Sequence, residues 1–175
     1  KTTTLLSLVA EHIHEGISPT KIGYFAFTNR AADEAKGRAF EQFNLTNDDL
    51  PFFRTLHSLA FQQLGLSRSQ VMTEDLRKEF GNLMGLQISG KSFLEEGSLN
   101  FSKKGDQILA LIEVARVKGI SCREQWLQEN LDISWFEIDR AERGLAEFKK
   151  ARGVYDFTDM LSMFISESTV PKLDI

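Results

Sequence analysis

Residues 21–36 decide the fold class, and they read Lys21-Ile22-Gly23-Tyr24-Phe25-Ala26-Phe27-Thr28-Asn29-Arg30-Ala31-Ala32-Asp33-Glu34-Ala35-Lys36. The segment up to Phe27 is nearly all apolar, which is typical of a strand that is covered on both faces. Thr28 and Asn29 follow, and both residue types favour the N-cap of a helix. The next residues predict a helix with acids in its first turn, where they complement the helix dipole. The stretch therefore predicts a buried strand that leads directly into a helix.

A second junction of the same kind follows at residues 51–64. Pro51-Phe52-Phe53-Arg54-Thr55 predicts a strand, and residues 56–64 predict a helix that ends at Gly65. A strand followed by a helix, repeated, indicates an α/β domain with a parallel sheet. Exposed N–H groups at such junctions can bind a phosphate of a nucleotide or of a nucleic acid. The alternatives are simple helix capping by Thr28 and Asn29 and a structural role for a partly buried His57.

The amino end has the chemistry of a phosphate site. The chain begins Lys1-Thr2-Thr3-Thr4 and continues with apolar residues at helical spacing. A Lys-Thr pair at the start of a helix is how the P-loop G-x-x-x-x-G-K-[ST] ends, where the lysine reaches phosphate and the hydroxyl ligates Mg²⁺. The glycines of such a loop would precede Lys1. Ordinary chemistry of a helix start is therefore the alternative to a nucleotide site.

Composition and charge narrow the class of protein. The 175 residues are 42% hydrophobic and 26% charged, as in a globular domain large enough to bury a core. No apolar run approaches the roughly 20 residues of a membrane helix, so we expect no membrane partner. The net charge of −4 argues against bulk coating of nucleic acid but leaves room for a local groove. The single Cys122 fits a reducing compartment, so we expect a cytoplasmic location.

Four segments carry a family resemblance, and they stand in a fixed order along the chain. They are Lys1-Thr2-Thr3-Thr4-Leu5-Leu6, Phe27-Thr28-Asn29-Arg30-Ala31-Ala32, Arg54-Thr55-Leu56-His57-Ser58-Leu59-Ala60 and Tyr155-Asp156-Phe157-Thr158-Asp159-Met160-Leu161. They resemble the end of the Walker A loop, motif Ia, motif Ib and the D-F-D-D-L-L segment of superfamily 1 helicases of the UvrD/Rep type. Each motif is short, but four in the right order with a helical interval between the third and fourth form a strong signal.

The resemblance implies a fold and its division. The fold class is α/β, a partial RecA-like P-loop NTPase parallel sheet with a mostly helical inserted subdomain. Residues 1–66 would be the first part of the RecA-like ATPase domain, residues 67–152 the helical insertion, and residues 153–175 the return to the RecA-like domain. The interval between positions 52 and 170 contains no proline, which agrees with a helical insertion.

The resemblance also implies roles for single residues. Lys1 would be the catalytic group that contacts the phosphates of ATP, Thr2 would ligate Mg²⁺, and Thr3 would belong to the same nucleotide site. Single-stranded DNA would lie along the residues Phe27, Thr28, Asn29, Arg30, Thr55 and His57. The chain departs from the family pattern at Arg30, where lysine is usual, at Leu56, where an aromatic is common, and at Thr158, where an acid is usual.

The function that follows is an ATP-dependent DNA helicase or translocase that moves on single-stranded DNA, in repair or replication. The D-E-x-Q acids of the family would follow residue 175, so we expect the 175 residues to be a fragment without ATPase activity of its own. Exposed sheet edges of such a fragment would favour non-native association.

Two other classes of protein stay open. One is a non-enzymatic α/β scaffold that binds nucleic acid or a partner. The other is a P-loop kinase or small-molecule ATPase, in which Asn29 and His57 would have unrelated roles. The helicase interpretation depends on one arrangement: the junctions at Thr28 and Thr55 should share one rim with Lys1 and expose their hydroxyls.

Overall fold

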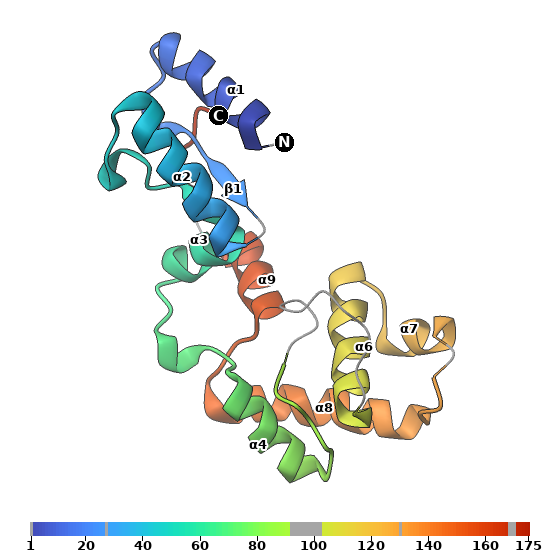
Figure 1. Ribbon diagram of the computed structural model, residues 1–175. Helices are drawn as coiled ribbons and strands as arrows, with labels where there is room; N and C mark the ends of the chain where they lie inside the picture. The colour runs from blue at the N-terminus through green and yellow to red at the C-terminus, as the bar shows by residue number, and fades with distance from the viewer. Residues whose placement is uncertain (1, 27, 92–102, 130, 168–170) are drawn as a thin grey trace. The chain divides into compact units, whose positions relative to one another are not determined.

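The computed structural model describes residues 2–26, 28–91, 103–129, 131–167 and 171–175 (Figure 1). The chain divides into two compact units, one of Lys1–Leu66 with Met160–Ile175 and the other of Ser67–Asp159. Each unit has its own cluster of buried hydrophobic side chains. Among the described residues, no helix is both long enough and apolar enough to cross a membrane.

The first unit alternates helices and strands along the chain. Its elements are α1 (Thr2–His14), η1 (Pro19–Lys21), β1 (Tyr24–Ala26), α2 (Asn29–Phe43), η2 (Asn47–Asp49), β2 (Phe53–Thr55) and α3 (Leu56–Gln63). Both strands are shorter than the sequence predicts. Lys21 closes the short helix η1, and residues 51–52 form a turn, so β1 begins only at Tyr24 and β2 only at Phe53.

The two strands of the first unit form a parallel sheet. The ladder pairs Tyr24 with Phe53 and Ala26 with Thr55. The rings of Tyr24 and Phe53 stack with their centroids 5.1 Å apart. The buried cluster of this unit also contains Leu6 and Val9 of α1 and residues of α2. Figure 1 shows both helices beside the strands. The described residues thus form an α/β layer in which apolar helix faces cover a short parallel sheet, as the sequence predicts.

The carboxyl-terminal residues lie beside β1. The Gly23 amide donates to the Ile175 carbonyl at 2.8 Å, and the Asp174 amide donates to the Lys21 carbonyl at 3.0 Å. Lys21 and Asp174 also form an ion pair at 3.1 Å. A Cβ atom on Gly23 would lie 2.8 Å from Cδ1 of Leu173 and 2.9 Å from Cε2 of Phe25, so a larger residue would require these side chains to shift. Part of the β1 edge is therefore covered, and association through the remaining sheet edges stays a prediction.

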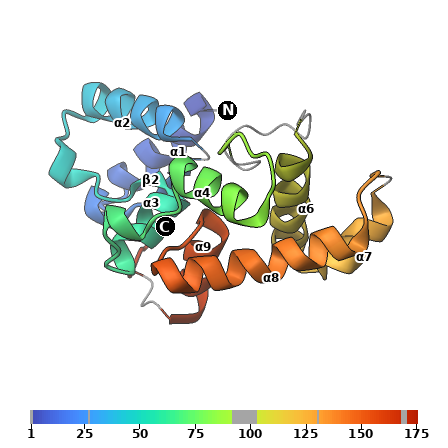
Figure 2. The same ribbon diagram turned by 90° about the horizontal axis from the view of Figure 1, so that it is seen from below.

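The second unit is mainly helical. Its elements are η3 (Arg68–Gln70), α4 (Glu74–Met84), α6 (Lys104–Lys118), α7 (Cys122–Gln128), α8 (Trp135–Arg152) and the first turn of α9 (Phe157–Glu167). An isolated parallel bridge joins Val71 to Tyr155. Figures 1 and 2 show that α6 and α8 lie against each other within this unit.

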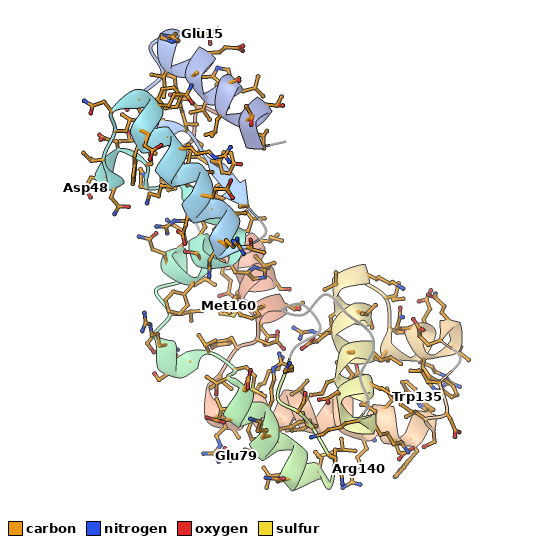
Figure 3. The ribbon with its side chains drawn as sticks, viewed as in Figure 1. Glu15, Asp48, Glu79, Trp135, Arg140 and Met160 are labelled. Atoms are coloured by element: carbon orange, nitrogen blue, oxygen red, sulfur yellow. The ribbon has the colours of Figure 1, made fainter. Side chains whose placement is uncertain are left out.

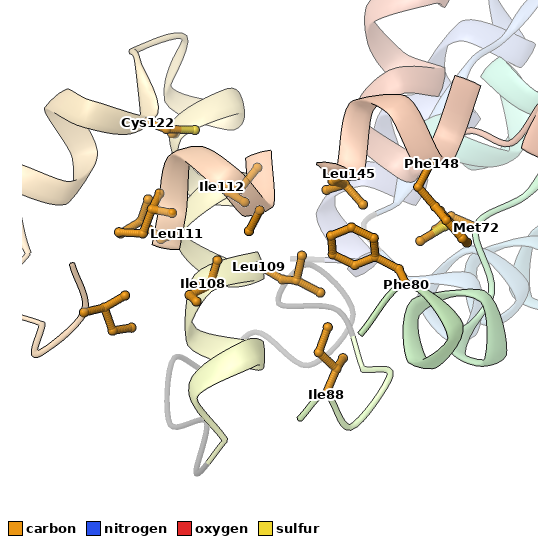
Figure 4. Close-up of a cluster of buried hydrophobic side chains, with 14 of the residues drawn as sticks. Met72, Phe80, Ile88, Ile108, Leu109, Leu111, Ile112, Cys122, Leu145 and Phe148 are labelled. Carbon is orange, nitrogen blue, oxygen red and sulfur yellow. The ribbon is translucent and has the colours of Figure 1, made fainter. Parts of the chain in front are cut away.

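Apolar side chains from α4, α6 and α8 build the core of the second unit (Figure 4). Phe80 of α4 packs against Phe148 of α8 with ring centroids 5.7 Å apart. Arg77 and Glu113 form an ion pair inside this unit: Arg77 Nη1 contacts Glu113 Oε1 at 2.6 Å, and the two side chains are 7% and 5% exposed. A buried pair of this kind needs both partners, because either charge alone would lose its hydration without compensation.

Several helix ends in the second unit follow patterns that the sequence shows. Thr73 precedes the acids of a helix start and caps α4, which Gly85 ends with a positive φ of 69°. Residues 121–124 and 134–137 both match the capping-box pattern S-x-x-E. Ser134 forms this box with Glu137, whereas Ser121 accepts the Glu124 amide without the reciprocal bond. The helical spacing of Trp126 and Trp135 favours core packing, and both pack against the core (Trp135 is labelled in Figure 3). Trp126 Nε1 donates to the Ile133 carbonyl at 2.8 Å.

Candidate nucleic-acid interface

The first strand-to-helix corner lies between β1 and α2. Thr28 has extended backbone angles, with φ −122° and ψ 150°, and its Oγ1 accepts the Ala31 amide at 3.2 Å. The residue is therefore the N-cap of α2, as its side-chain type predicts. Thr28, Asn29 and Arg30 are all exposed. Phe27, which the resemblance places along DNA, lies outside the described residues.

The first turn of α2 has no acidic residue, which corrects a sequence prediction. The helix begins at Asn29, a full turn before Asp33 and Glu34, because Thr28 takes the cap position. The amino end of α2 therefore combines its unpaired amides and positive dipole with the side chain of Arg30. This corner suits an anion such as a backbone phosphate of nucleic acid.

The second corner lies between β2 and α3 and has the same cap. Thr55 Oγ1 accepts the Ser58 amide at 3.1 Å, with φ −82° and ψ 154°. Unlike Thr28, however, Thr55 is only 6% exposed. The expectation that both hydroxyls face outward is therefore wrong for Thr55. Its place in β2, the strand whose Phe53 joins the core, carries the side chain inward, which a local pattern does not reveal.

His57 and Leu56 complete the second corner. His57 is half-buried, and burial lowers the pKa of its imidazole below the ordinary value. The ring is therefore neutral at pH 7 and does not add a positive charge at this corner. Leu56 is 47% exposed, at the position where the family commonly has an aromatic. This corner consequently offers an apolar side chain and a neutral imidazole.

The parallel register brings the two corners to the same edge of the sheet. Ala26 is the ladder partner of Thr55, so both strands end at the same level. In parallel sheets the helices that follow the strands then present their amino ends on one side, where α/β proteins bind ligands. The structure thus brings Thr28, Asn29 and Arg30 to the edge that also carries Thr55 and His57.

The amino end of α1 carries the candidate nucleotide residues. Lys1 lies outside the described residues, and of Thr2 the structure describes only the backbone, as the first residue of α1. Thr3 is exposed, and the first turn of α1 contains no acid. Hydroxyls and free amides without a competing carboxylate are a donor set that fits phosphate oxygens and a hydrated Mg²⁺ ion.

The fourth motif forms a charge cluster that the sequence did not indicate. The Asp159 amide donates to Asp156 Oδ1 and the Asp156 amide donates to Asp159 Oδ2, each at 2.9 Å, which confirms Asp156 as a cap. Arg116 of α6 contacts the two carboxylates at 2.7 and 2.5 Å. Lys149 of α8 contacts them at 2.7 and 2.6 Å. Lys149 lies in the last turn of α8, where a basic side chain complements the helix dipole, so its two ion pairs add to that interaction.

The D-x-x-D spacing of Asp156 and Asp159 could have indicated mutual capping from the sequence. Their basic partners could not be found this way, because Arg116 is 40 positions from Asp156. Desolvation opposes the charge of Asp156, but Lys149 and Arg116 outweigh it and hold the pKa of this carboxyl well below its usual range. The cluster thus brings two basic and two acidic side chains into contact.

Comparison with known proteins gives one result. The family model described as "UvrD/REP helicase N-terminal domain" matches residues 1–172 of the chain. No curated protein and no solved structure matched the chain. The matched residues include both strand-to-helix corners, the candidate nucleotide residues and the fourth motif.

Proposed function

Because this chain belongs to the UvrD/REP helicase N-terminal domain family, we propose that it is part of the RecA-like motor of an ATP-dependent DNA helicase that moves along single-stranded DNA. The observation that carries the proposal is the register of Ala26 with Thr55. This register sets two helix amino ends on one edge of a parallel sheet, an arrangement that can follow a phosphate backbone without reading its sequence.

At the first corner, the exposed side chains and the α2 amides would contact one backbone phosphate. Arg30 supplies the positive charge, and no acid in this turn opposes it. At the second corner the Thr55 hydroxyl is occupied by the Ser58 amide. The DNA contact there would therefore use the backbone at the start of α3 and the neutral imidazole of His57. Phe27 would stack on a base, a contact that tolerates any sequence.

At the amino end, Lys1 would bind phosphate oxygens of ATP, and Thr2 and Thr3 would hold the nucleotide and Mg²⁺. Bound Mg²⁺ and ATP would supply the phosphoryl-transfer chemistry that drives movement. The exposed Thr3 and the acid-free first turn of α1 support this assignment. A division of the motor near residues 66 and 153, a cytoplasmic location and a role in repair or replication belong to the same proposal.

Binding of a fluorescent oligo(dT) to the 175-residue chain, followed by anisotropy, tests the DNA interface. We expect weak, salt-dependent binding, a loss of about 1–3 kcal/mol for Phe27→Ala, and a salt slope that falls by about one for Arg30→Ala. Arg38→Ala is the matched control, because Arg38 lies on the same helix but pairs with Glu34. Equal effects of Arg30→Ala and Arg38→Ala would contradict the interface. Absence of DNA binding would favour a kinase or a partner-binding scaffold.

Phosphate release from ATP tests the second part of the proposal. The 175 residues contain no D-E-x-Q sequence, so we expect no turnover by this chain alone, with or without DNA. Turnover that Lys1→Ala abolishes would overturn the expected inactivity while supporting the nucleotide site. In the anisotropy assay, a duplex and an RNA oligonucleotide of matched length show which kind of strand the chain prefers to bind.

A further inference from the structure

A small pocket lies in the second unit between α6 and α7, two helices that lie side by side (Figure 1). Its volume is about 90 Å³. This is less than the roughly 150 Å³ of a cavity that accepts benzene, and far less than the roughly 300 Å³ of the smallest sites for drug-sized ligands. The pocket therefore has room for one side chain and not for a nucleotide.

The two sides of the pocket differ in polarity. The side formed by α6 is apolar and includes Ala110, Leu111 and Val114. The opposite side includes Gln125 and Glu129. Gln125 is only 1% exposed, whereas Glu129 is exposed, so the pocket reaches the surface at Glu129.

The side chain of Gln125 holds the Glu129 carboxylate in place. Gln125 Nε2 donates to Glu129 Oε1 at 2.8 Å, and Lys118 Nζ donates to Gln125 Oε1 at 2.9 Å. Lys118 therefore binds the other end of the amide, and it is not among the residues that line the pocket. Within the described residues, no hydrogen bond occupies the second oxygen of Glu129, Oε2.

The charge beside the pocket is negative and uncompensated. Glu129 and Asp132 are exposed and stand on either side of Leu131, which also lines the pocket. In the part of the chain that the structure describes, neither acid forms an ion pair. Arg123, the basic residue of α7, lies over the Trp135 ring, with its Cζ atom 5.9 Å from the ring centroid. The pocket thus joins an apolar wall to a carboxylate that lacks a cation.

We propose that this site, called here the α6–α7 pocket, binds a lysine side chain of a partner protein. The aliphatic stem of the lysine would pack on the apolar wall from α6, and its ammonium would pair with Glu129 Oε2. Lysine fits better than arginine because Gln125 already occupies one oxygen of Glu129. The carboxylate therefore offers one oxygen to a compact charge and not the two that a guanidinium binds. This inference does not depend on the proposed function.

Titration of the isotope-labelled 175-residue chain with N-acetyl-lysine methylamide, followed by two-dimensional NMR, tests the site. We expect saturable shifts of amides in residues 110–114 and 125–129, with a dissociation constant of about the millimolar order, as for a ligand that buries few atoms. N-acetyl-norleucine methylamide keeps the aliphatic stem and lacks the ammonium. It should bind about fivefold more weakly, because it cannot form the ion pair.

Two variants separate the charge from the apolar wall. Glu129→Gln removes the charge and keeps an acceptor for Gln125 Nε2, so it should weaken binding of the lysine probe about fivefold and leave the norleucine probe unchanged. Glu124→Gln is the matched control, because Glu124 is an exposed acid of the same helix that does not line the pocket. Val114→Phe fills the pocket from its apolar wall and should abolish binding of both probes.

Three results would overturn the proposal. One is the absence of saturable shifts in residues 110–114 and 125–129. Another is equal binding of the lysine and norleucine probes, which would assign the pocket to an uncharged apolar group. The third is equal weakening by Glu129→Gln and Glu124→Gln, which would show a general attraction of the lysine probe to an acidic protein.

Discussion

The two units of this protein use their polar side chains in opposite ways. At the first corner of the first unit, Thr28, Asn29 and Arg30 are exposed. In the second unit, Arg77 and Glu113 pair in the interior, and Asp156 is buried with two basic partners. Because a buried charge is stable only when it is paired, the polar groups of the second unit serve its own fold. Those of the first corner remain available to a ligand.

The largest effect should come from the interior pair. Arg77→Met leaves Glu113 buried without its guanidinium partner and should destabilise the protein by about 3–5 kcal/mol. Denaturant unfolding followed by circular dichroism measures this change. The double variant Arg77→Met/Glu113→Leu should recover much of the loss, because a well-packed apolar pair avoids the desolvation cost. Arg77→Met can be compared with the loss of an exposed ion pair such as Arg38 with Glu34. If Arg77→Met lowered the free energy of unfolding by less than that loss, the interior pair would have to be hydrated.

The next largest effect concerns Asp156 and pH. Its folded pKa lies below the unfolded value, so its contribution to stability is full above about pH 4 and is lost as the pH falls toward the folded pKa. Asp156→Asn should destabilise the protein by about 1.5–3 kcal/mol at pH 7, the contribution of hydrogen bonds to a charged group. The difference between the two proteins should shrink below pH 4. Denaturant unfolding at a series of pH values checks this, and a constant difference would contradict it.

The smallest effect compares the two caps directly. Thr55→Val keeps the shape of a buried side chain but removes the acceptor of the Ser58 amide, and should destabilise by about 1–2 kcal/mol. Thr28→Val should cost less, about 0.5–1 kcal/mol, because water reaches the exposed Ala31 amide. Unfolding midpoints of the two variants give the comparison. If Thr28→Val destabilised the protein more than Thr55→Val, exposure would not determine how much stability each cap contributes.

Local patterns predicted much of the candidate interface. The cap at Thr28 and the parallel sheet are confirmed. Caps are predictable because a side chain and an amide three positions away interact within one turn of chain. The order of the four motifs identified the UvrD/Rep resemblance, which the family match confirms.

The two threonine corners show where local patterns stop. Thr28 and Thr55 both precede a helix, cap it in the same way and have extended backbone angles, yet Thr28 is exposed and Thr55 is only 6% exposed. Burial depends on what packs over a residue. The burial of Thr55 is decided by the elements that pack against β2. The residues next to Thr55 in the chain do not specify those elements.

The sequence alone determined the elements, their caps and the family, because each of these depends on residues within a few positions or on their order. The tertiary structure alone decided that Ala26 aligns with Thr55, that residues 174–175 lie along β1, and that Arg116 and Lys149 meet the two aspartates. These contacts join residues that are far apart in the chain, and their energies depend on burial and on the distance between charges. Neither quantity exists until the chain has folded.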